Sequence, residues 1–151
     1  MGDKYDEKKR RDFIGYNLNF KFYGKVFLPY CFNNHWCLFI LNIRDESITH
    51  YDPYGNILAA NNNHEIETRF LEYLHRCKIL DPNMNNLLKI NWKIVKANPN
   101  VAHQSDIYNC GCYVIYYMDM NAKSSMNSKE NFNPDCYRIE IAQFLIQILY
   151  L

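Results

Sequence analysis

Apolar residues along the chain recur with two different periods, and each period predicts a kind of secondary structure. Two runs rich in β-branched and aromatic residues, 25–30 and 36–43, have the length of strands. A third run, 47–52, follows across the polar turn 44–46, so the pattern predicts a hairpin. In 88–94 apolar and polar residues alternate, which is typical of a strand with one buried face.

Three further segments have the spacing of helices. The first is 64–80, ended by Asp81-Pro82, with apolar positions at Ile66, Phe70, Leu71, Leu74 and Cys77. The second runs from Cys110 to Met120 and begins at the cysteine. The third is capped by Asn133, with Pro134 in its first turn. We expect this last helix to pack within the domain through Ile139, Ala142, Phe144, Leu145, Ile148 and Leu149.

The length of 151 residues predicts a single domain over 1–151, with 1–24 as a variable N-terminal part. Apolar residues make up 48% of the chain and charged residues 22%, a globular composition. The formal charge of +1 argues against nucleic acid as a partner. The sequence has no signal-peptide core in its first twenty residues and no membrane-length apolar run, so we expect an intracellular protein that does not enter a membrane.

Six cysteines stand at positions 31, 37, 77, 110, 112 and 136, and no two are spaced as C-x-x-C. In an intracellular protein such cysteines are reduced thiols rather than disulfides. Ligation of zinc by Cys31, His35 and Cys37 is disfavoured, because so short a spacing within a strand aims the ligands poorly. We therefore expect neither a metal nor an organic cofactor.

Residues with catalytic potential come from the ends of these elements. Antiparallel pairing of the hairpin brings His35 and Asp52 toward the same edge of the sheet, where a carboxylate can orient an imidazole. Cys110 at a helix start lies in the positive field of the helix dipole, which stabilises a thiolate. Gly111 removes a side chain where a substrate carbonyl must approach, and Gln104 on the preceding loop can donate to an oxyanion together with the Cys110 amide.

The order of these residues is similar to that of a known protease family. His35-Trp36, then Tyr51-Asp52, then Gln104 six residues before Cys110-Gly111, resemble the ubiquitin-like-protein-specific proteases, including SUMO-specific and viral adenain-type relatives. The likeness covers roughly 25–151 and extends to the segment 25–29, the strand of Trp92, and Tyr137-Arg138.

The resemblance implies a papain-like α+β fold, with a central mixed sheet packed against helices. It also implies a thiol isopeptidase or endopeptidase that cleaves after the C-terminal diglycine of a SUMO-like or other ubiquitin-like protein, for precursor processing or deconjugation. We expect catalysis by Cys110, His35, Asp52 and Gln104, and substrate binding by Trp36, Gly111 and Asn109. The expected state is a monomer in the cytoplasm or nucleus, or in a host cell for a viral or effector protein.

The chain departs from the family pattern at three points. No segment before Lys25 resembles the one that supplies a second channel tryptophan in the family. Asn109 stands where the family commonly has Asp, and His103 where it usually has Gln. A longer parent protein, a minimal viral or effector protease and a decayed copy each explain the missing segment.

Three other functions remain open. They are cleavage of a different substrate by a viral or effector-type endopeptidase, binding of ubiquitin-like proteins with weak catalysis or none, and acetyl transfer from acetyl coenzyme A. Acetyl transfer is disfavoured by Asp52, where such enzymes prefer Glu, and by the lack of a clear basic site for the coenzyme phosphates.

Overall fold

The computed structural model describes residues 24–55, 62–80, 92–97, 100–123 and 132–149, without the side chains of 62–63 and 77–80. Within these ranges the chain forms four strands and three helices. The strands are β1 (Lys25–Phe32), β2 (His35–Asn42), β3 (Ser47–Tyr51) and β4 (Lys93–Lys96), and the helices are α3 (Asn62–Leu80), α5 (Cys110–Ala122) and α6 (Pro134–Leu149).

The four strands form one mixed sheet in the order β1-β2-β3-β4. β1 pairs antiparallel with β2, and β2 with β3, which confirms the predicted hairpin and extends it by one strand. β4 pairs parallel to β3, with Ile94 opposite Ile48. β4 begins at Lys93, later than the alternating pattern predicts; Trp92 precedes it, and 88–91 lie outside the described residues.

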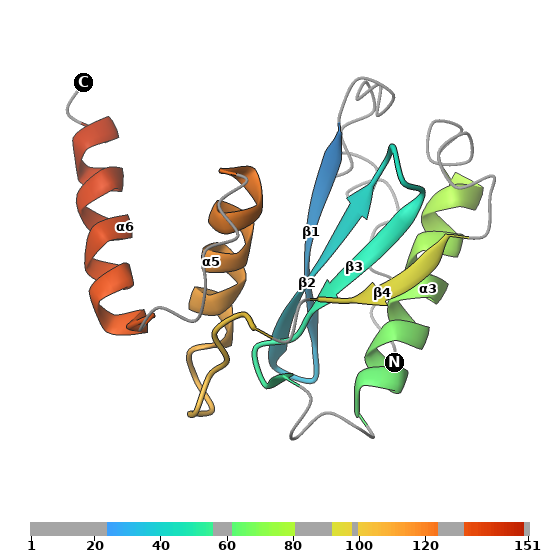
Figure 1. Cartoon of the computed structure of the whole chain (residues 1–151), viewed down its shortest axis with the longest axis horizontal. Coiled ribbons are helices and arrows are strands. Elements are labelled where there is room, and N and C mark those ends of the chain that lie inside the picture. Colours follow the sequence, from blue (N-terminus) through green and yellow to red (C-terminus); the bar gives the residue numbers. More distant parts are fainter. Residues whose placement is uncertain (1–23, 56–61, 81–91, 98–99, 124–131, 150–151) are drawn as a thin grey trace, which may run out of the picture.

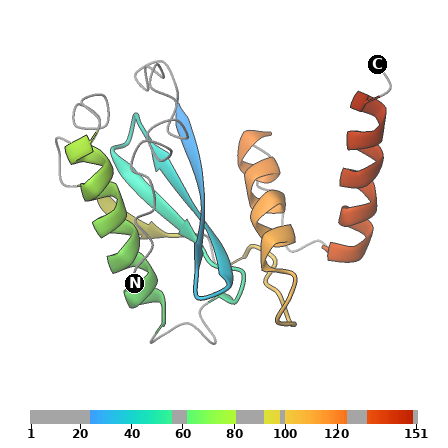
Figure 2. The same cartoon turned by 180° about the vertical axis from the view of Figure 1, so that it is seen from behind.

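β2 is buried on both faces, because helices cover the sheet from two sides (Figures 1 and 2). Its odd-numbered core residues, Cys37, Phe39 and Leu41, pack in a cluster with α3. The even-numbered Leu38 and Ile40 pack in a second cluster with α5. The molecule is therefore layered as α3, sheet and α5, with α6 beyond α5.

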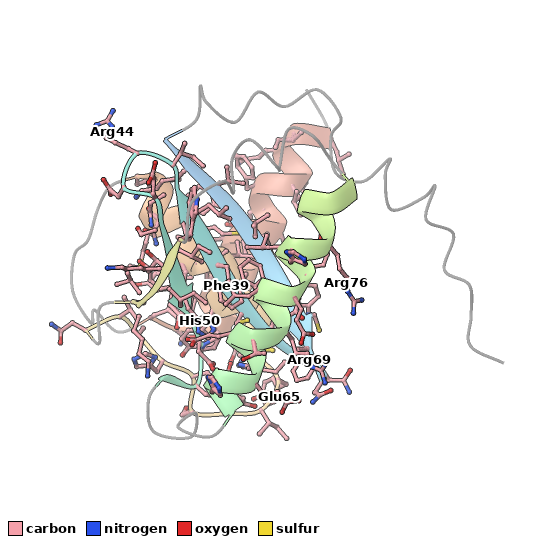
Figure 3. All side chains as sticks on the ribbon, turned by 90° about the vertical axis from the view of Figure 1, so that its right-hand side faces the viewer. Phe39, Arg44, His50, Glu65, Arg69 and Arg76 are labelled. Atoms are coloured by element: carbon pink, nitrogen blue, oxygen red, sulfur yellow. The ribbon has the colours of Figure 1, made fainter. Side chains whose placement is uncertain are left out.

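α3 lies across one face of the sheet and buries the predicted apolar stripe only in part. Ile66, Phe70 and Leu74 are buried, and the Phe70 ring stacks on that of Phe39 with centroids 3.6 Å apart. Leu71 is 42% exposed, so it lies at the margin of the apolar stripe rather than in the core. Figure 3 shows Phe39 and His50 beneath the helix and Arg76 on its outer side.

α5 covers the opposite face through tyrosines whose rings are buried and whose hydroxyls hold a loop. The Tyr117 hydroxyl donates to the Ala102 carbonyl at 2.7 Å, and the Tyr113 hydroxyl donates to the His103 carbonyl at 3.1 Å. Burial raises the pKa of both tyrosines, so these hydroxyls stay protonated donors. The loop that leads to Gln104 is thereby fixed to the helix that begins at Cys110.

α6 exists as predicted, but its expected burial is wrong. Its first turn is anchored, since the Tyr137 ring contacts Phe132 and Tyr116 and the Cys112 thiol donates to the Pro134 carbonyl. None of the helix's residues is fully buried. The side chains that we expected in the core are exposed, including Ile139, Phe144, Leu145, Ile148 and Leu149. Apolar spacing predicts the helix, but it carries no information on what packs against its apolar face.

Candidate active site

A two-residue turn places His35 at the first position of β2. Asn33 and Asn34 both have positive φ, 49° and 61°, as the central residues of a type I′ turn require. Asparagine tolerates this conformation better than most residues do. The turn pairs Phe32 with His35, so the hairpin register fixes where the imidazole lies at this end of the sheet.

Asp52 lies one residue beyond β3, where Pro53 stops the strand and Gly55, with φ of 65°, completes a turn back to the Asp52 carbonyl. His35 Nε2 and Asp52 Oδ1 are 2.8 Å apart, which confirms that the carboxylate reaches the imidazole. Both side chains are sheltered, 13% and 6% exposed. The Tyr54 amide donates to the same oxygen at 2.9 Å and fixes the carboxylate.

The face of the His35 imidazole is also in contact with an aromatic ring. Tyr54 stacks on His35 with centroids 4.4 Å apart and 19° between the planes. Because the Asp52 carboxylate accepts a hydrogen bond from Nε2–H, the other ring nitrogen, Nδ1, is the acceptor of the neutral imidazole. This nitrogen is buried and has no hydrogen-bond partner among the described residues, Cys110 included. The sequence analysis missed Tyr54; an aromatic residue two positions after the aspartate was the available signal.

Cys110 is the first residue of α5 and is 6% exposed. The helix therefore begins at the sulfur-bearing residue, as predicted, and its dipole favours a negative charge there. Two other described cysteines, Cys37 and Cys112, are buried as well. Burial raises the pKa of both thiols, so they stay protonated and poorly nucleophilic at neutral pH.

Gln104 is brought to the site by a contact between two loops. The backbone amide of Gln104 donates to the carbonyl of Pro53, the residue after Asp52, at 2.8 Å, and the Gln104 side chain is buried. Side-chain Nε2 donates to the Asp106 carbonyl at 2.8 Å, and Oε1 is buried without a partner among the described residues. The neighbouring His103 ring packs against Gly55, where an added Cβ would lie within 2.8 Å of it.

Trp36 and Gly111 lie beside each other across the gap between β2 and α5. A Cβ added to Gly111 would be 3.9 Å from Cδ1 of the indole, an ordinary contact. The missing side chain therefore leaves space beside Cys110 rather than relieving a clash. Trp36 is 42% exposed, whereas Asn109 is 2% exposed, so of these two side chains only the indole is accessible from outside.

All seven residues predicted for the site thus come from four neighbouring segments of the fold. His35 and Trp36 open β2, Asp52 follows β3, Gln104 lies on the loop before α5, and Asn109, Cys110 and Gly111 form the start of α5. In the described part of the chain, no group of three or more His, Cys, Asp or Glu side chains is arranged to hold a metal ion. No helix in these ranges has the length and hydropathy needed to span a membrane.

The profile of the family described as "Ulp1 protease family, C-terminal catalytic domain" matches residues 8–147. Comparison with curated protein sequences finds no match.

Solved structures of SUMO protease Ulp1 share the fold. One, with its catalytic cysteine oxidised to a sulfinic acid, has a TM-score of 0.59 and 17% identity, over 87% of this chain and 54% of that one. The C-terminal Ulp1 protease domain in complex with Smt3, the yeast orthologue of SUMO, has a TM-score of 0.51 and 16% identity, over 86% and 52%. The chain spans about half the length of these structures. The likeness confirms the predicted α+β fold class.

Proposed function

The chain belongs to the Ulp1 protease family, and on this premise we propose that it is a cysteine peptidase that cleaves after the C-terminal diglycine of a SUMO-like protein. The observation that carries the proposal is the state of His35. One ring nitrogen is bonded to Asp52 at 2.8 Å, and the other is buried and has no hydrogen-bond partner in the part of the chain that the structure describes. This arrangement suits a general base, because the free ring nitrogen can accept a proton.

In the proposed reaction His35 Nδ1 takes the proton of the Cys110 thiol. The thiolate attacks the carbonyl of the last glycine, and the oxyanion forms beside the start of α5. The Cys110 amide and the second N–H of the Gln104 side chain donate to this oxyanion. The imidazolium, stabilised by Asp52, gives its proton to the leaving amine, and water then hydrolyses the thioester.

The proposed substrate class rests on two observations. The exposed Trp36 indole lies in van der Waals range of the place where a Gly111 side chain would be, so the approach to Cys110 beside the indole favours a substrate residue with no side chain. One solved relative, the Ulp1 protease domain, is in complex with Smt3, the yeast orthologue of SUMO. We extend this partner class to the present chain, with action on precursors or on conjugates, inside the cell.

The test uses SUMO and ubiquitin that carry a C-terminal propargylamide, which adds the thiol of a recognised protease across its alkyne. We expect covalent capture of SUMO by the wild-type chain and none by Cys110→Ala. Capture by His35→Ala should be strongly reduced. Cys136→Ala is the matched control, because Cys136 is an exposed free thiol on α6, and it should react as the wild type does.

Each outcome of this test separates the candidate functions. Capture of ubiquitin but not SUMO would keep the chemistry and change the substrate. Binding of unmodified SUMO by a chain that captures neither modifier would replace the peptidase with a non-catalytic binder. A folded chain that neither binds nor captures either protein would refute the assignment to ubiquitin-like substrates.

A further inference from the structure

The loop between Gln104 and the nucleophile is built around the carboxylate of Asp106. Asp106 Oδ1 accepts from the amides of Tyr108 and Asn109 at 2.9 and 2.8 Å, and Oδ2 accepts from the Asn109 side-chain amide at 2.8 Å. The Asp106 carbonyl accepts from Gln104 Nε2, also at 2.8 Å. One residue therefore contacts both Gln104 and the residue that precedes the nucleophile.

The contact with Asp106 determines which way the Gln104 amide points. A carbonyl oxygen only accepts, so the side-chain atom bonded to the Asp106 carbonyl must be the nitrogen. The NH₂ group has two hydrogens, and this bond uses one of them. The other is left to donate at a position fixed by Asp106.

Asn109 is held by Asp106 on one side and by α5 on the other. Its backbone and side-chain amides both donate to the Asp106 carboxylate, and its carbonyl accepts the Tyr113 amide at 3.1 Å. Its backbone is not helical, with φ of −93° and ψ of 4°, and it makes no side-chain cap bond to the helix. The peptide between Asn109 and Cys110 carries the Cys110 N–H, so its orientation depends on how Asn109 is held.

We propose that Asp106 is a positioning residue that orients both oxyanion donors, the Gln104 side-chain amide directly and the Cys110 amide through Asn109. The proposal rests on the proposed function, which makes Cys110 the nucleophile and these two groups the donors. Donors preorganised at the oxyanion position contribute most when the transition state forms. Asp106 therefore acts on the rate of acyl transfer and not on the reactivity of the thiolate.

The negative charge of Asp106 strengthens these contacts, because the three groups bonded to its carboxylate oxygens are N–H donors. Partial burial opposes ionisation, but the bonds from the Asn109 side chain and the two amides outweigh it, and Arg138 adds to them. They hold the pKa of Asp106 below its usual value, so it is ionised at neutral pH. An asparagine at 106 that keeps its oxygen on the two backbone amides turns its NH₂ group toward the NH₂ group of Asn109. The two side chains can pair again only if the Asn109 amide turns over, and the charge-assisted bond is lost in either case.

Two small reagents separate the proposed role from a general structural one. p-Nitrophenyl acetate acylates a thiolate: the S–C bond forms through a tetrahedral oxyanion, and the C–O bond breaks to release p-nitrophenolate. Iodoacetamide alkylates the same thiolate by displacing iodide, with no oxyanion. The rate at Cys110 is the difference between each protein and the same protein with Cys110→Ala, which removes the contribution of the exposed Cys31 and Cys136.

For Asp106→Asn we expect the rate of acylation to fall by about tenfold or more. This loss is smaller than the loss of about a hundredfold that follows when an oxyanion donor is removed altogether. Alkylation should be unchanged. The double variant Asp106→Asn with Asn109→Asp restores an amide–carboxylate pair in the opposite sense, and acylation should recover. Asp45→Asn, the same change in the exposed β2–β3 turn, is the matched control and should leave both rates as in the wild type.

Several results would overturn the proposal. Unchanged acylation in Asp106→Asn would remove the positioning role and leave Cys110 as the nucleophile. An equal fall of acylation and alkylation in a folded variant would assign Asp106 to the thiolate or to the fold. Loss without recovery in the double variant would show that the pair with Asn109 does not carry the effect. A wild type acylated no faster than Cys110→Ala would remove the nucleophile itself, and with it the proposed function.

Discussion

A second histidine–carboxylate pair, between β3 and α3, gives the most direct test of how the site is supported. His50 Nδ1 and Glu67 Oε1 are 3.0 Å apart, with side chains 3% and 20% exposed. The His50 ring stacks on Phe39, and its Nε2 is buried without a partner among the described residues. Glu67 thus bonds to a residue of β3 that lies one position before the strand ends at Tyr51 and two positions before Asp52.

The cost of removing Glu67 follows from the burial of its partner. In Glu67→Ala the His50 Nδ1 donor is left buried and unpaired, which costs about 1–3 kcal/mol. A protein of this size loses about 2–4 °C of Tm per kcal/mol, so we expect a fall of roughly 2–12 °C. Glu67→Gln keeps a neutral acceptor for His50. Because a hydrogen bond to a charged group is about twice as strong as one between neutral groups, this variant should lose about half as much stability as Glu67→Ala.

The effect should also depend on pH. The hydrogen bond from His50 lowers the pKa of Glu67, and partial burial opposes it only in part. A depressed carboxylate pKa stabilises the folded state above the unfolded value, about 4.3, and this contribution is lost as pH falls through the folded value. The difference in unfolding free energy between wild type and Glu67→Gln should therefore hold at neutral pH and shrink in acid.

Urea denaturation followed by circular dichroism, at pH 7 and at pH values below 4, measures both effects. Glu72→Ala on the same helix is the control, because the Arg69–Glu72 pair is about half exposed at both ends and such pairs contribute about 0.5 kcal/mol or less. If Glu67→Ala is no more destabilising than Glu72→Ala, or if its cost is independent of pH, the reasoning about the buried pair is wrong.

Three further predictions concern the catalytic pair and the core. Asp52→Asn removes a charge-assisted hydrogen bond to His35 worth about 1.5–3 kcal/mol. The kcat for cleavage of a substrate made from the modifier that the capture test identifies should fall tenfold or more, with little change in KM; an unchanged kcat would contradict the assigned role. Tyr54→Ala should lower kcat severalfold, because stacked rings contribute about 0.5–1.5 kcal/mol, while Tyr54→Phe keeps the ring and should retain activity; equal rates for both would exclude stacking as the cause. Phe70→Ala should cost about 3–5 kcal/mol in urea denaturation, and Leu71→Ala about 1 kcal/mol or less, since only Phe70 lies in the core; similar costs would contradict the observed helix orientation.

The sequence predicts the site well where position along an element decides geometry. His35 and Asp52 meet because an antiparallel pair returns the chain, and this follows from two strand runs and a short turn. Cys110 begins its helix as the apolar spacing from that residue indicates. These inferences need only periodicity and the ends of elements, which are local properties of the sequence.

Contacts that depend on side-chain direction were not predictable in this way. The stacking of Tyr54 on His35 requires the rotamer of a turn residue, and the four bonds at Asp106 require the shape of a loop. The position of α6 depends on surfaces elsewhere in the fold, which helical spacing does not encode. The Asn33-Asn34 turn was within reach, because two asparagines between strand runs are a known hairpin signal.

The separation of the site's parts along the chain determines when a folding molecule can become reactive. The imidazole and its carboxylate are 17 residues apart within a meander of neighbouring strands, whereas the sulfur is carried by a helix that docks from much later in the chain. Local contacts form sooner than those that close long loops. In a refolding chain we therefore expect the His35–Asp52 pair to form before Cys110 docks beside it, so that recovery of the proposed hydrolysis would report the docking of α5. A chain arrested before that step would lack the complete proposed site.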